Sequence, residues 1–149
     1  GLLDSNTWDQ VQSAALGVFK RGQEIAMQAV IILVDTKYEF GCTAEGNVAL
    51  IDEVHTPDSS RFWKADSYDQ RFAAGEDPEN FDKEFVRLAY AEKGYRGDGE
   101  IPLMPDELWV SASERYIQIY EMLTGKEFVP GTYPVEKRLI ENLKQGGLI

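Results

Sequence analysis

Two runs of β-prone residues separated by a short turn constrain the fold of this chain more than any other feature. The first run, Val30–Val34, is apolar and mostly β-branched, as in a buried strand. Beyond it apolar and polar residues alternate, which is the period of a strand with one exposed face. The second run, Val48–Val54, follows a turn that contains Gly46. This arrangement predicts a β-hairpin, with the polar side chains Asp35, Lys37 and Glu39 on one face.

Helical periodicity is found on both sides of the hairpin. Over Thr7–Ala29 apolar residues recur every three or four positions, and Asn6 or Thr7 is the expected N-cap. The same spacing predicts three later helices, and polar stretches with Pro, Gly and Ser predict loops. The order helix, hairpin, helices predicts a single α+β domain over residues 1–149, with an antiparallel sheet packed against several helices. The later helices are expected at Phe81–Lys93, Pro105–Leu123 and Pro134–Lys144, with Gly125 ending the second, and the loops at Thr56–Trp63 and Ser67–Asn80.

The charge and cysteine content exclude several classes of protein. Of the 149 residues 26 are acidic and 15 basic, a net charge of −11, so neither nucleic-acid binding nor docking on an anionic membrane is expected. Cys42 stands alone, which excludes an internal disulfide and a thiolate zinc site and favours a reducing, cytoplasmic setting. No apolar run approaches the ~20 residues of a membrane span. Neither Cys42 nor the single histidine, His55, is expected to carry nucleophilic chemistry, because the chain offers no second histidine as a relay.

Paired carboxylates on the hairpin suggest a metal site. If Glu45 and Gly46 are the central residues of a tight turn, Glu39 falls directly opposite Asp52. Two carboxylates about 5 Å apart repel each other by roughly 3 kcal/mol at an effective dielectric of ~20. A cation between them would remove that repulsion, and carboxylate oxygens are ligands that Mg²⁺ prefers. The alternative is a solvated outer face on which Lys37 screens the acids, and a shift of one residue in register would separate the pair.

A second group of polar residues follows the second strand. The loop Asp58-Ser59-Ser60-Arg61 supplies hydroxyl groups and a guanidinium that can bind a phosphate or carboxylate bidentately. Lys83 and Arg87 are four residues apart on one helix face and could reach the same anionic ligand. The alternatives are a capped turn whose arginine pairs with Asp58 or Asp66, and a solvated helix face.

The motifs themselves carry a resemblance. The segments Leu33-Val-Asp-Thr-Lys-Tyr-Glu-Phe-Gly41 and Leu50-Ile-Asp-Glu-Val-His-Thr-Pro-Asp-Ser-Ser-Arg-Phe-Trp63 resemble the paired signatures of the SAICAR synthase family, the phosphoribosylaminoimidazole-succinocarboxamide synthases of purine biosynthesis. Phe81-Asp-Lys-Glu-Phe-Val-Arg87 is similar to the family's Asp-Lys-x-x-x-Arg helix, and Pro102–Gly125 to the C-terminal helix of its longer members. Where His55 stands, the family usually has an apolar residue. The resemblance extends over nearly the whole chain.

The resemblance implies a reaction and a role for each polar residue. ATP, a carboxyaminoimidazole ribotide and L-aspartate would give the succinocarboxamide, ADP and phosphate, through an ATP-dependent carbon–nitrogen ligation that uses Mg²⁺. Lys37 would contact phosphate or the substrate carboxylate, and Asp35 would be a base or support the residues that bind substrate. The remaining roles implied are metal binding by Glu39 and Asp52, and ribotide binding by Asp58, Ser59, Ser60, Arg61, Lys83 and Arg87.

The resemblance also implies that this chain corresponds to the C-terminal part of a two-lobed fold. The family's N-terminal ATP-binding lobe, with its glycine-rich loop, has no counterpart before Thr7. We therefore expect the chain to need that lobe as a partner for full activity, and the exposed surface where it would pack to favour a homo-oligomer. One alternative is a non-catalytic module that retains nucleotide or ribotide binding. Another is a small-molecule kinase, which would also use a metal ion held by carboxylates but does not require the Pro57–Arg61 loop.

Overall fold

The N-terminal helix is longer than its periodicity predicts. In the computed structural model, which describes residues 3–81 and 83–149, α1 spans Ser5–Gln28. Its N-cap is Asp4, so the prediction of Asn6 or Thr7 was wrong. The backbone N–H of Thr7 donates to the Asp4 Oδ1 atom at 3.0 Å, which satisfies one of the free amides of the first turn and lowers the pKa of Asp4.

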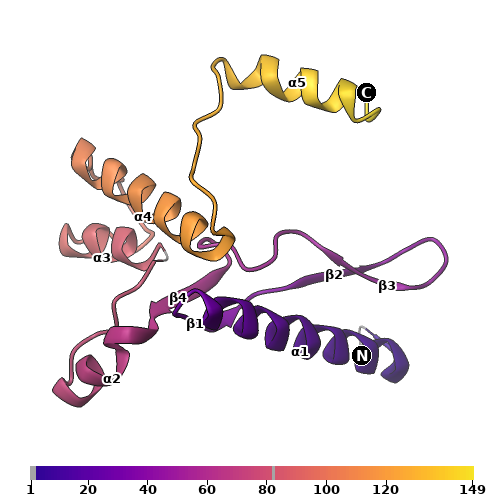
Figure 1. Ribbon diagram of the computed structural model, residues 1–149, viewed down its shortest axis with the longest axis horizontal. Coiled ribbons are helices and arrows are strands. Elements are labelled where there is room, and N and C mark those ends of the chain that lie inside the picture. Colours follow the sequence, from indigo (N-terminus) through magenta and orange to yellow (C-terminus); the bar gives the residue numbers. More distant parts are fainter. Residues whose placement is uncertain (1–2, 82) are drawn as a thin grey trace.

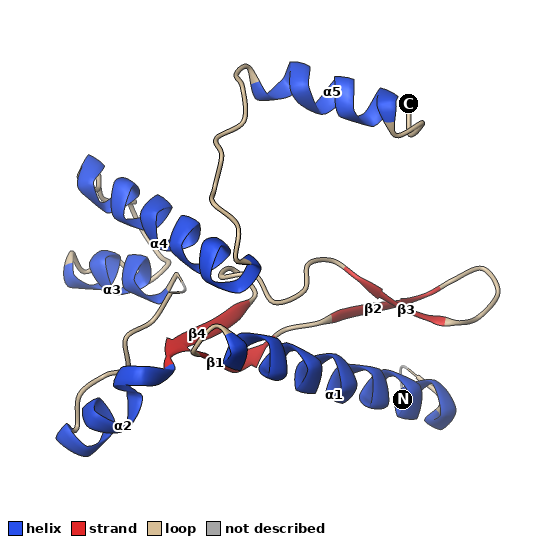
Figure 2. Ribbon diagram, in the orientation of Figure 1, coloured by secondary structure: helices blue, strands red, loops and turns tan. Residues whose placement is uncertain are grey.

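The predicted hairpin is present only in its outer half. β2 (Glu39–Cys42) and β3 (Val48–Ile51) pair antiparallel, whereas β1 (Ile31–Thr36) pairs antiparallel with β4 (Ser60–Lys64). The expectation of a loop throughout residues 56–63 is therefore wrong, because the short strand β4 directly follows a polar turn in the sequence. β1 is apolar along its first four residues, and it buries them against β4 and α1 rather than against β3. Figure 2 shows the β1–β4 pair at the C-terminal end of α1 and the β2–β3 pair extending away from the β1–β4 pair.

The core lies where α1, β1, β4 and α4 meet. Full burial of a Leu, Ile or Phe side chain contributes about 1.5–3 kcal/mol, so this small cluster holds the sheet to its helices. Met122 and Leu123 of α4 (Asp106–Thr124) and Phe19 of α1 pack around it. The buried members are Ala26, Ile31, Leu33, Phe62, Phe81 and Ile119.

Three of the helices predicted after the hairpin are confirmed. α3 (Glu84–Glu92) falls in its expected segment, and α4 and α5 (Val135–Gln145) do so to within one residue. Gly125, which adopts a left-handed φ of 65°, ends α4 as predicted. The expectation of a surface loop over residues 67–80 is wrong in part, because α2 (Ala65–Ala74) occupies its first half and ends on the left-handed Gly75.

The elements differ in how closely they pack. Figure 1 shows α3 and α4 above the β1–β4 pair and α2 below it, while α5 stands apart at the end of an extended segment. None of the described helices is both long and apolar enough to cross a membrane.

Candidate functional site

The β1–β4 ladder places Asp35 directly across from Arg61. The Arg61 Nε atom donates to both carboxylate oxygens of Asp35, at 2.9 and 3.0 Å, and Nη2 bonds Oδ2 as well. This fork lowers the pKa of Asp35 and outweighs the opposing effect of burial. The register of the pair shifts between Leu33 and Asp35, an irregularity of the kind that re-aims a side chain at a strand edge. Arg61 therefore pairs with Asp35, whereas the capped-turn alternative expected it to pair with Asp58 or Asp66.

The turn before β4 is built by Thr56. Its Oγ1 atom accepts hydrogen bonds from the backbone N–H groups of Asp58 and Ser59, at 3.3 and 3.2 Å, and donates to the carboxylate of Glu53. The backbone N–H of Ser60 closes the turn on the Thr56 carbonyl at 2.9 Å. One hydroxyl thus organises the loop that carries the predicted ligand-binding residues.

A second contact fastens this loop to β1. The buried Ser60 hydroxyl lies 2.8 Å from the Thr36 hydroxyl, and the Lys37 backbone N–H donates to the Ser59 carbonyl at 3.1 Å. Both serines therefore have structural partners, since the half-buried Ser59 hydroxyl accepts a hydrogen bond from the Thr56 backbone N–H at 3.3 Å.

Six of the predicted site residues meet in one shallow pocket of about 210 Å³. Lys83, just before α3, reaches over this pocket and its Nζ atom lies 2.8 Å from Asp58 Oδ1. Pro57 and Glu84, which sequence reasoning missed, complete the lining. The predicted residues gathered here are Asp35, Asp58, Ser59, Ser60, Arg61 and Lys83.

Arg87 does not line this pocket. Its guanidinium pairs with Glu84 one turn earlier in α3, which raises the pKa of Arg87 and lowers that of Glu84. Arg87 instead lines a neighbouring cavity of about 450 Å³ together with Tyr90 and Arg96. Glu84 therefore stands between the two cationic groups that the sequence placed on one helix face.

The predicted register of the β2–β3 hairpin is wrong by one residue. Glu39 lies opposite Ile51 rather than Asp52. The turn has three central residues instead of two, because the Thr43 N–H donates to the Asn47 carbonyl at 2.9 Å and Gly46 adopts a left-handed φ of 83°. A type I turn with glycine in the left-handed position is the usual three-residue hairpin connection.

The acidic side chains Glu39, Asp52 and Glu53 nevertheless lie near one lysine, Lys37. Lys37 Nζ lies 2.5 Å from Glu39 Oε1, and this hydrogen bond is the main cause of the raised pKa of Lys37. The charges of Asp52 and Glu53 raise it further. Asp52 has a left-handed φ of 77°, unusual for a residue other than glycine and frequent at functional sites. Within residues 3–81 and 83–149, no three His, Cys, Asp or Glu side chains are grouped as a metal site.

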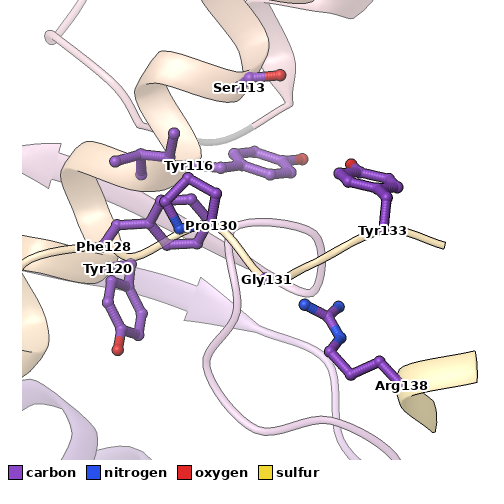
Figure 3. Close-up of a pocket in the computed structure, with 9 residues that line it drawn as sticks. Ser113, Tyr116, Tyr120, Phe128, Pro130, Gly131, Tyr133 and Arg138 are labelled. Carbon is purple, nitrogen blue, oxygen red and sulfur yellow. The ribbon is translucent and has the colours of Figure 1, made fainter. Parts of the chain in front are cut away.

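A further cavity lies elsewhere. It has a volume of about 490 Å³ and opens between α4, the segment after it and α5. Figure 3 shows aromatic rings from Tyr116, Tyr120, Phe128 and Tyr133 around it, with the Arg138 guanidinium pointing at Gly131. A Cβ at Gly131 would overlap that guanidinium, so glycine lets α5 approach the preceding segment. None of the site residues predicted from the sequence lines this cavity.

The fold and the pocket together describe an α+β protein with a charged surface site. Comparison with known proteins gives the family. A profile of the SAICAR synthetase family matches residues 1–102, and the chain belongs to this family.

Individual relatives support the assignment. The chain is 48% identical over 151 residues to the phosphoribosylaminoimidazole-succinocarboxamide synthase of Legionella pneumophila strain Paris, covering 97% of this chain and 47% of that protein. A solved SAICAR synthase aligns with a TM-score of 0.67 at 33% identity, over 82% of this chain and 40% of that one. A SAICAR synthetase solved in complex with ADP aligns with a TM-score of 0.60 at 28% identity, over 85% and 42%. The chain therefore spans about half the length of the relatives it matches.

Proposed function

We propose that this chain supplies the ribotide-binding and metal-binding part of an ATP-dependent ligase that joins L-aspartate to carboxyaminoimidazole ribotide in purine biosynthesis. The observation that carries the proposal is the gathering of six residues, predicted from separate motifs, in one pocket of a member of the SAICAR synthetase family. The ADP held by one solved relative supports the use of ATP.

The pocket has the donors that a ribotide phosphate needs. Arg61 and Lys83 supply the positive charge, and Ser59 adds a short neutral donor. Without ligand each cation is held by a carboxylate, Arg61 by Asp35 and Lys83 by Asp58. A phosphate dianion would share or replace these partners, so the two acids keep the cations aimed at the pocket beforehand.

The arrangement also assigns roles to Asp35 and Lys37. An acid with a lowered pKa is a weak base, so we infer that Asp35 acts by orienting Arg61 rather than by taking a proton. Lys37 remains the catalytic candidate, since its raised pKa keeps it cationic where negative charge develops on a phosphoryl group or carboxylate. Arg87, outside this pocket, is retained as a more distant contact for the anionic substrate.

Glu39 and Asp52 fit a magnesium ion by their chemistry. Both offer hard carboxylate oxygens next to Lys37, and both are exposed, so water and phosphate oxygens could complete the coordination. Bound Mg²⁺ neutralises phosphate charge during phosphoryl transfer. Lys37 would have to release Glu39 for the ion, which leaves the ammonium available to the substrate.

The full reaction requires more than these residues. Phosphorylation of the ribotide carboxylate and attack by the aspartate amine would need ATP held above Lys37. We propose that a further lobe, corresponding to the part of the relatives that this chain does not match, holds it, in a cytoplasmic enzyme. The second candidate function is a non-catalytic module that binds ribotide or nucleotide, and such a module would need only the charged pocket.

Isothermal titration of the ribotide into the 149-residue chain tests the binding site. Arg61→Lys keeps the charge but loses the fork, and one charge-assisted bond is worth about 1.5–3 kcal/mol, so the dissociation constant should rise at least about tenfold. Arg71→Lys is the matched control, because Arg71 on α2 pairs with Glu76 just after that helix and does not line the pocket. Equal affinities of wild type and Arg61→Lys would refute the assignment.

A further inference from the structure

A single loop joins the two halves of the site. The loop begins at Asp52, beside Lys37. It ends at Asp58 and Ser60, which line the pocket proposed to bind the ribotide phosphate. The closing end is fixed by the Thr56 turn and by the Ser60 contact with β1. Some other contact must fix the opening end, because Asp52 is exposed and its backbone is in the left-handed region.

His55 provides that contact. Its backbone is also left-handed, with a φ of 53°, which turns the side chain from the surface toward α1. The imidazole ring lies against Gly22, so closely that a Cβ at Gly22 would overlap the ring atoms Cε1 and Nδ1. Gly22 is buried, and its other neighbour is the core residue Leu33.

Tyr38 holds the other edge of the ring. The His55 Nε2 atom and the Tyr38 hydroxyl are hydrogen-bonded, and the two rings lie 5.5 Å apart at an angle of 58°. Both side chains are half-buried, and burial raises the pKa of Tyr38 and lowers that of His55, so the pair is neutral at pH 7. Tyr38 stands between Lys37 and Glu39 in the chain, so the bond ties the loop of Asp52 to the segment of the other two charged groups.

We propose that His55 and Tyr38 form a latch, seated on Gly22, that positions Asp52 beside Lys37 and Glu39. The inference rests on the proposed function in that the acids are taken to hold a divalent cation. The two residues are positioning residues, since neither lines the pocket proposed to bind the ribotide phosphate. β3 also contacts α1, and the latch is a further contact that connects the acids to the packed body through α1.

The test uses Mn²⁺ as the probe and the 149-residue chain as the protein. Paramagnetic broadening of the Glu39 and Asp52 amide resonances reports the apparent affinity at the acids. Tyr38→Phe removes one hydroxyl and keeps the ring, and should raise the half-broadening Mn²⁺ concentration about fivefold, the effect of one hydrogen bond. Tyr95→Phe is the matched control, because Tyr95 contacts the Tyr90 ring, at an angle of 57°, in another part of the molecule.

A second variant separates positioning from loss of fold. His55→Asn tolerates the left-handed backbone but cannot reach Tyr38 as the ring does. Its effect on Mn²⁺ should match that of Tyr38→Phe, and the double variant should be no worse than the stronger single one, because both break one bond. Thermal midpoints measured on the same samples identify any variant that merely unfolds.

The outcomes distinguish the latch from the metal site. Mn²⁺ broadening at Asp52 that is the same in wild type and Tyr38→Phe overturns the latch. Absence of broadening in the wild type overturns the metal site of the proposed function. The latch is then tested by amide hydrogen exchange measured without metal. In that measurement Tyr38→Phe should speed exchange of the 52–55 amides about fivefold, and unchanged exchange would overturn the latch.

Discussion

Alanine at Gly22 should destabilise the chain, although alanine is the best helix former and Gly22 lies inside α1. Exchanging glycine for alanine within a helix ordinarily gains about 1 kcal/mol. At Gly22 the new methyl group would overlap the His55 ring and lie 2.8 Å from Leu33 Cδ2. Neither neighbour moves freely, because His55 is bonded to Tyr38 and Leu33 is fully buried.

The size of the effect follows from two opposed contributions. Forcing one methyl group into a packed site costs about 1–3 kcal/mol. After the helix propensity is deducted, we expect a net loss of about 1 kcal/mol in the free energy of unfolding. Gly17 is the matched control on the same helix: nothing lies within 4 Å of a Cβ there, so Gly17→Ala should gain about 0.5–1 kcal/mol.

Urea unfolding followed by circular dichroism measures both variants under one protocol. The combination Gly22→Ala with His55→Ala adds a test of cause, since removing the ring makes room for the methyl group. His55→Ala should therefore cost less stability in the Gly22→Ala background than in the wild type. If Gly22→Ala gains as much stability as Gly17→Ala, the placement of the His55 ring on α1 is refuted.

Three further predictions concern the same region. Asp35 has a lowered pKa, so it stabilises the fold above its ordinary pKa of 3.8 and loses this effect as the pH falls through the folded value; Asp35→Asn should lack this acid-side loss in a urea titration against pH. His55 has a lowered pKa, so below the ordinary pKa of 6.5 the unfolded chain binds a proton first, and the free energy of unfolding decreases as the pH falls. His55→Asn should give a flatter profile of stability against pH, and a profile identical to that of the wild type would contradict the burial of the ring. Thr36→Val removes the hydroxyl partner of the buried Ser60 and should cost about 1–3 kcal/mol in urea unfolding, whereas an unchanged midpoint would show that the contact contributes nothing.

The sequence predicted the parts of the fold that depend on local chemistry. The helices that contain Glu84–Glu92, Asp106–Thr124 and Val135–Gln145 follow from their apolar spacing and from the residues that end them. The pairing of β1 was missed because strand partners are set by tertiary burial. Ile31 and Leu33 lie on one face of β1 and are buried in the core together with Phe62 of β4, whereas no residue of β3 belongs to that buried cluster.

The sequence predicted which residues gather in the candidate site but not how they are arranged. Motif spacing could not reveal that Asp35 faces Arg61, since that contact depends on β4. The register at Glu39 depended on the loop length, and a three-residue turn and a two-residue turn have nearly the same composition. His55 was discounted because no second histidine accompanies it. Its partners are Gly22 and a tyrosine hydroxyl, which leave no recognisable spacing in the sequence.

The 149-residue chain by itself should not catalyse the ligation at the rate of a full-length relative. Its described charged pocket holds only about 210 Å³ and is open, so it can position a ribotide phosphate but does not enclose the ATP phosphates as well. Positioning two reactants contributes roughly 7–11 kcal/mol in a well-held reaction, and loss of half of this lowers the rate by about three to four powers of ten. An open site also admits water, which competes with the aspartate amine for an acyl phosphate.

A coupled ADP-release assay with ribotide, aspartate and Mg²⁺ compares the chain with the full-length Legionella pneumophila relative, 48% identical to it. The expected result is a rate at least about a thousandfold lower for the chain, with ribotide binding retained and weakened by Arg61→Lys. Binding without turnover would agree with a division of labour in which this part holds the ribotide and metal while the ATP is held elsewhere. Turnover close to that of the relative, abolished by Lys37→Met, would instead mean that these 149 residues contain the ATP site, and the assignment of the nucleotide to a further lobe would be wrong.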